Sequence, residues 1–100
     1  MKLIVLMSLE ENKDQIRKVF KEHGVHIYSE VDMTGHTSEV IDQYGWWHIE
    51  EDMPIYSKLY FAIVVKEKAD EIMNDIDKIK KDFDPQHPPR AFQVNVEKMI

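Results

Sequence analysis

The residues best suited to chemistry lie together in one stretch, MTGHTSEVIDQYGWWHIEEDMP, which covers residues 33–54. His36 and His48 share this stretch with Glu39, and imidazole and carboxylate groups are ligands for divalent metal ions. The histidine spacing matches no metal-binding signature, and a solvated loop is polar in any case. A divalent-metal site at His36, His48 and Glu39 is therefore one hypothesis, and an ordinary polar loop is the other.

The aromatic residues of the same stretch indicate a contact surface. Trp46 and Trp47 are adjacent, so an extended backbone directs their side chains to opposite sides and one core cannot cover both. Large aromatic side chains on a loop are typical anchors of protein interfaces. We expect Trp46 and Trp47, with Tyr44 nearby, to contact a partner protein or to fold back onto the protein's own oligomer.

Sequence motifs for catalysis are missing. None of the four serines sits in a nucleophile elbow, and the three glycines are too dispersed to form a phosphate-binding loop. The chain has no cysteine, which excludes a thiolate nucleophile, a disulfide framework and Cys-based metal centres. We therefore expect a protein that is not an enzyme.

Composition limits the class of protein further. One hundred residues with 43% hydrophobic content predict a single domain over residues 1–100 with one modest core. A net charge of −6 argues against nucleic-acid binding, because the phosphate backbone attracts basic surfaces. The apolar run at residues 3–7 is too short for a signal peptide or a membrane span. We expect a cytoplasmic protein with no membrane insertion.

The elements that must position these residues follow from hydrophobic periodicity. Ser8 and Glu11 form a capping-box pattern that predicts a helix start, and Gly24 stands where a left-handed residue would end that helix. The prolines of the segment DPQHPP, residues 84–89, end a second helix. The predicted strands cover residues 3–7, 25–33, 59–65 and 92–96, and the predicted helices cover residues 9–23 and 69–83.

This βαββαβ order predicts a ferredoxin-like α+β fold. Right-handed crossovers place both helices on one face of a four-stranded antiparallel sheet, with a long loop between strands 2 and 3. The opposite face carries, by alternation, residues such as Tyr60, Ala62 and Val64, which are too apolar to be left in water. We therefore expect a homo-oligomer that covers this face with copies of itself.

The sequence also resembles the PII signalling proteins. Gly35, His36 and Thr37 follow a strand and precede a long loop, as in the Lys-Gly-His-Thr segment that opens the T-loop of that family. The strand PIYSKLYFAIVV, residues 54–65, is similar to the strand that closes the T-loop. The resemblance implies a homotrimer with inward-facing sheets and small effectors in the clefts between subunits. It also implies that the loop, residues 33–58, engages a target such as a transporter or an enzyme.

The chain departs from the PII pattern at the nucleotide site. The glycine-rich B-loop is replaced by DPQHPPR, in which only Arg90 occupies the position of the motif's final lysine. The Gly-Phe-Gly-Arg-Gln segment before the loop is replaced by residues 30–34. ATP and 2-oxoglutarate binding in the usual PII mode is therefore not expected, and the effector is not identified. The ligand-binding residues that the resemblance implies are Gly35, His36, Thr37 and Arg90.

Two alternatives remain open at the level of sequence. One is a metal-binding protein that resembles CutA, another trimeric ferredoxin-like protein, with His36, His48 and nearby carboxylates as ligands. The other is a plain oligomerisation domain whose long loop has no partner.

Overall fold

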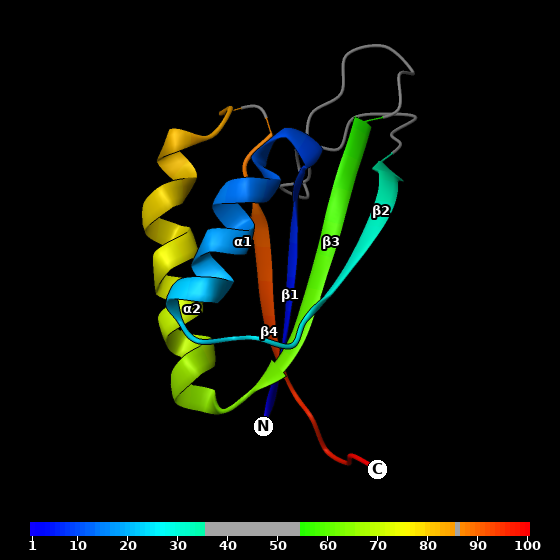
Figure 1. Ribbon diagram of the computed structural model, residues 1–100, viewed down its shortest axis with the longest axis vertical. Coiled ribbons are helices and arrows are strands. Elements are labelled where there is room, and N and C mark those ends of the chain that lie inside the picture. Colours follow the sequence, from blue (N-terminus) through cyan, green and yellow to red (C-terminus); the bar gives the residue numbers. More distant parts are fainter. Residues whose placement is uncertain (36–54, 86) are drawn as a thin grey trace.

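The computed structural model describes residues 1–35, 55–85 and 87–100 of the chain, with the side chains of residues 55 and 56 excepted. One layer of two helices covers one face of a single sheet (Figure 1). None of the described helices combines the length and the apolar composition that crossing a bilayer requires. The elements are β1 (Lys2–Leu9), α1 (Lys13–Glu22), β2 (Ser29–Gly35), β3 (Ile55–Val64), α2 (Lys66–Ile79) and β4 (Arg90–Asn95).

The sheet has the strand order β2-β3-β1-β4, and every neighbouring pair is antiparallel. This topology confirms the predicted ferredoxin-like arrangement. Strands β1 and β3 are central, because each is paired on both sides, whereas β2 and β4 are the two edges. β2 ends and β3 begins at the same end of the sheet, where the connection of residues 36–54 joins them (Figure 1).

The apolar core lies between the sheet and the helices. Ile4 and Leu6 of β1 face this layer with Tyr60 and Ala62 of β3, since residues two apart share a face and paired residues share it too. The prediction that Tyr60, Ala62 and Val64 lie on the uncovered face is wrong. The helices and the turns that flank them contribute the rest of the core: Ile16, Val19, Phe20, Val25, Ala69, Ile72, Ile76 and Phe83.

The face of the sheet away from the helices is nevertheless apolar, as expected. We call it the open face and define it by the alternate positions of the four strands. Alternate residues of a strand point to opposite faces, so the residues of β3 on the open face are Leu59, Phe61 and Ile63. Its most exposed large side chains are Phe61 (38%), Ile63 (43%), Phe92 (44%), Val94 (47%) and Val31 (48%).

The first helix begins later than the capping box predicts. Ser8 is fully buried within β1, and its Oγ accepts a 3.5 Å hydrogen bond from Nδ2 of Asn12. A single 3₁₀ turn, Glu10–Asn12, precedes α1, and neither the turn nor α1 has a side-chain N-cap. The predicted helix end at Gly24 is confirmed by its φ of 70°. The amide of the next residue, Val25, donates to the carbonyl oxygen of Phe20 at 2.9 Å and closes a Schellman motif.

Among the strand starts, those of β2 and β3 differ most from the prediction. Val25 is part of the core, and β2 begins only at Ser29. The chain between them is needed to carry the backbone from the helix layer down to the sheet. Strand β3 begins at Ile55, four residues before the predicted start, because β2 supplies pairing partners up to Gly35.

Candidate functional site

Buried polar side chains gather at the end of the sheet where residues 36–54 connect β2 to β3. Within the described part of the chain, the buried polar residues are Ser8, Asn12, Ser57 and Lys58. Ser8 pairs with Lys58 in the β1–β3 ladder, and the neighbouring pair places Ser57 beside Leu9. The hydroxyl of Ser57 is buried with no hydrogen-bond partner among the described residues. Because buried polar groups cost free energy unless they are paired, this cluster makes the loop end of the sheet a candidate for a functional site.

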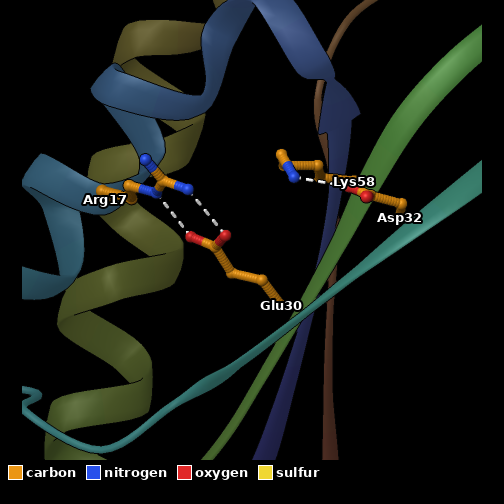
Figure 2. A network of polar contacts seen from close by, with 4 residues as sticks. All are labelled: Arg17, Glu30, Asp32 and Lys58. Carbon is orange, nitrogen blue, oxygen red and sulfur yellow. Dashed lines mark hydrogen bonds and ion pairs between the residues drawn. The ribbon is translucent and has the colours of Figure 1, made fainter.

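Lys58 provides the positive charge of this region. Its ammonium group donates a hydrogen bond to the carboxylate of Asp32, its partner in the β2–β3 ladder (Figure 2). The Lys58 side chain is largely covered, whereas that of Asp32 is 82% exposed. The hydrogen bond raises the pKa of Lys58 and lowers the pKa of Asp32. The ammonium group of Lys58 is therefore held near the start of β3, which follows the connection of residues 36–54.

A second ion pair joins β2 to the helix layer. Arg17 of α1 donates from Nε and Nη2 to the two carboxylate oxygens of Glu30, at 2.5 and 2.8 Å (Figure 2). This two-point geometry fixes the guanidinium plane as well as its distance. The hydrogen bonds lower the pKa of the Glu30 carboxyl and raise the pKa of Arg17, so both groups remain charged at neutral pH.

Tyr60 lies in the ladder beside Glu30 and is fully buried beneath the helices. Its hydroxyl has no hydrogen-bond partner among the described residues. Burial raises the pKa of this hydroxyl, and the negative charge of Glu30 raises it further. Tyr60 is therefore a neutral phenol and cannot serve as a base at physiological pH.

An open groove of about 950 Å³ runs beside Arg17, between α1 and the segment that leads into β2. Tyr28 lines it with a ring that stacks on Phe20 at a centroid distance of 4.5 Å and an interplanar angle of 14°. The groove carries charges of both signs, so it shows no strong preference for anions or cations. The remaining lining residues are Asp14, Lys18, Lys21, Glu22, Val25 and His26.

Arg90, which the sequence indicates as a ligand-binding residue, is the first residue of β4. It pairs with Met7, and this register places it at the loop end of the open face. Its Nε is buried without a hydrogen-bond partner, and no carboxylate in the described part of the chain forms an ion pair with it. Arg90 also lines a depression of about 530 Å³ between α2 and the start of β4, together with Pro88 and Pro89.

Gly35 and Arg90 lie at the same end of the sheet but on opposite edges, since β2 and β4 are the outer strands. Three strand spacings separate them by about 14 Å, and Gly35 is about 13 Å further along the strand direction. One chain therefore does not bring these two residues into one small-molecule site.

The other sequence-predicted residues, His36, Thr37, Glu39, Tyr44, Trp46, Trp47 and His48, lie outside the described residues. The predictions for ligand binding, partner binding and metal binding at these positions therefore remain predictions. The described ranges contain no cluster of three or more potential metal ligands.

The sequence patterns did not predict that Arg17, Glu30 and Asp32 form ion pairs at β2. A signal was present, because Glu30 and Asp32 are two residues apart in a strand and so share a face. Lys58, which directly precedes the apolar residues 59–65, was a second indication of an ion pair in the sheet. The partner on α1 was not predictable, since it depends on how the helix packs on the sheet.

Comparison with known proteins supports the fold. The chain is similar to a protein from Thermus thermophilus whose crystal structure carries the description "putative PII-like signaling protein". The TM-score is 0.63 and the sequence identity is 19%, over 95% of this chain and 85% of that chain. No protein-family model matches the sequence, and no curated protein matches it either. At this identity the likeness establishes a shared fold, and fold alone does not determine function.

Proposed function

We propose that the protein is a PII-like trimeric regulator of the cytoplasm and not an enzyme. In this proposal it senses a small anionic ligand at clefts between subunits. It engages a partner, a membrane transporter or an enzyme, through the loop of residues 33–58. The open apolar face is the observation that carries the proposal, and the PII-like fold supports it.

The open face favours assembly because it is too apolar for a solvent surface. Monomeric proteins rarely expose large contiguous apolar patches, and here every strand contributes to one. Side chains of β1, β3 and β4 lie next to one another in the register, for example Val5 with Phe61 and Phe92. Closed symmetry around a central axis covers such a face in every copy at once.

Assembly would also complete a ligand site. The β2 edge ends in Gly35 and the β4 edge begins with Arg90, so a contact between the β2 edge of one copy and the β4 edge of the next would bring the two residues together. Arg90 supports anion binding because its guanidinium has no carboxylate partner in the described ranges. A PII-type phosphate cradle is not expected, because Pro88 and Pro89 have no backbone N–H to donate.

Thermal-shift measurements test the ligand site. The parent protein, Arg90→Ala and Lys78→Ala are screened against ATP, 2-oxoglutarate, citrate and inorganic phosphate. Lys78 is an exposed residue of α2, so its variant controls for the loss of one positive charge. A ligand at ten times its dissociation constant stabilises by about 1.4 kcal/mol, which raises Tm by about 5 °C or more in a domain of this size.

We expect at least one anion to raise Tm in the parent and in Lys78→Ala, and to lose this effect in Arg90→Ala. Identical responses of the parent and Arg90→Ala to every anion would refute Arg90 as a ligand-binding residue.

A further inference from the structure

Strand β2 is attached to the domain differently from the other strands. None of its seven residues is buried, and none belongs to the apolar core or packs against it. The other edge strand, β4, also has no buried residue, but its Ala91 packs against the core. The attachment of β2 therefore depends on its ladder with β3 and on polar side chains, rather than on apolar burial.

Two ion pairs supply these polar contacts, and they reach different parts of the molecule. Asp32 pairs with Lys58 and stays within the sheet. Glu30 pairs with Arg17 and crosses to the helix layer. Among the residues that the structure describes, this bridge is the side-chain hydrogen bond that joins β2 to a helix. Figure 2 shows both pairs, with Arg17 approaching β2 from α1 and Lys58 approaching Asp32 from β3.

We infer that β2 is a detachable edge strand and that the Arg17–Glu30 bridge is its latch to the helix layer. Segments with few buried apolar contacts and exposed backbone hydrogen bonds open locally at a lower free energy than the core. β2 has no buried residue, and one of its two long sides is an edge of the sheet without a partner strand in the single chain. The latch links α1 to β2, and β2 ends at residue 35, where the connection of residues 36–54 begins. This inference concerns the single chain, in which β2 is an edge strand, and it does not depend on the ligand of the proposed function.

Hydrogen exchange measured by mass spectrometry tests the latch. In Arg17→Met, the β2 amides that bond to β3 are expected to exchange about 3- to 10-fold faster, since a two-point ion pair of this exposure adds a modest stabilisation. Peptides from β1 are expected to exchange more slowly than those from β2 in both proteins, because the central strand opens at a higher free energy. Lys18→Met is the matched control, because Lys18 neighbours Arg17 and pairs with Glu22 inside α1 without touching β2. In this control, β2 is expected to exchange as in the parent.

A charge-reversed double variant, Arg17→Glu with Glu30→Arg, is expected to restore the slow exchange of β2. If Arg17→Met does not fold, Glu30→Gln provides the same comparison against Lys18→Met. Equal β2 exchange in Arg17→Met and Lys18→Met would overturn the inference. Exchange of β2 that is no faster than exchange of β1 in the parent would also overturn it, because β2 would then open only together with the whole domain.

Discussion

Replacement of Phe61 by glutamate places a charge in the middle of the open face. Phe61 pairs with Val5 on one side and Ser29 on the other, and its side chain is already 38% exposed in the single chain. We therefore expect the folded monomer to tolerate Phe61→Glu and an assembly through this face to be disrupted by it.

The magnitude follows from the exposure of the face. Complete burial of a large apolar side chain contributes about 1.5–3 kcal/mol. The five large side chains of the open face are each about two-fifths to one-half exposed. Covering them in an assembly therefore stabilises it by about 3–7 kcal/mol per subunit. Phe61→Glu removes the burial energy of Phe61 from this sum and buries an unpaired carboxylate. Together these two effects destabilise the assembly by at least about 2 kcal/mol per subunit. Three copies lose about 6 kcal/mol, which raises the dissociation constant of a trimer about 10⁴-fold.

Sedimentation velocity measures this change directly. The parent is expected to sediment as a particle of about 36 kDa, three times the 11.9 kDa chain, and Phe61→Glu as a folded monomer. Asn74→Glu adds the same charge on the exposed side of α2 and is expected to remain assembled. A monomeric parent, or a Phe61→Glu variant that remains assembled, would refute the role given to the open face.

Further predictions concern stability. Tyr60→Phe removes a buried hydroxyl that has no partner in the described ranges, so the free energy of unfolding in urea should stay equal or rise by up to about 1 kcal/mol; a clear loss would reveal a partner. Glu30 and Asp32 have folded-state pKa values below their ordinary values of 4.5 and 3.8, so the unfolded state binds more protons there and stability is lost as pH falls through this range. Glu30→Gln should flatten the pH dependence of the urea midpoint between about pH 6 and pH 3, and an unchanged slope would contradict the pKa assignment. Gly24→Ala meets no atom within 4 Å but must adopt a φ of 70°, so it should cost about 1 kcal/mol of unfolding free energy; a neutral result would contradict the left-handed cap.

The sequence specified the fold where local chemistry and periodicity agreed. The helix end at Gly24 needed only the local preference for a left-handed residue, and the βαββαβ order followed from alternating periods. The start of α1 was misplaced because Ser8 has a pairing partner, Lys58, that extends β1 beyond the local capping signal. The pairing of Ser8 with Lys58 between β1 and β3 therefore outweighed the local capping-box preference for a helix start at Ser8.

The two faces of β3 were exchanged for a different reason. Residues 59–65 are apolar at every position, so alternation does not distinguish the covered face from the open one. Only the polar residue Lys58 could have identified the covered face of β3, because it shares a face with Tyr60. It pairs with Asp32 on the helix side of the sheet. The Arg17–Glu30 bridge depends on the packing of α1 over β2, and no local pattern contains that information.

The chain contains its own probe for a change in the loop when a ligand binds at the proposed subunit clefts. Its only two tryptophans are Trp46 and Trp47, so intrinsic fluorescence reports on residues 33–58 without a label. An anion that raises Tm in an Arg90-dependent manner is titrated into the parent and into Arg90→Ala while tryptophan emission is recorded. We expect a saturable change in emission in the parent and none in Arg90→Ala. An anion that stabilises the parent through Arg90 and leaves tryptophan emission unchanged would contradict it.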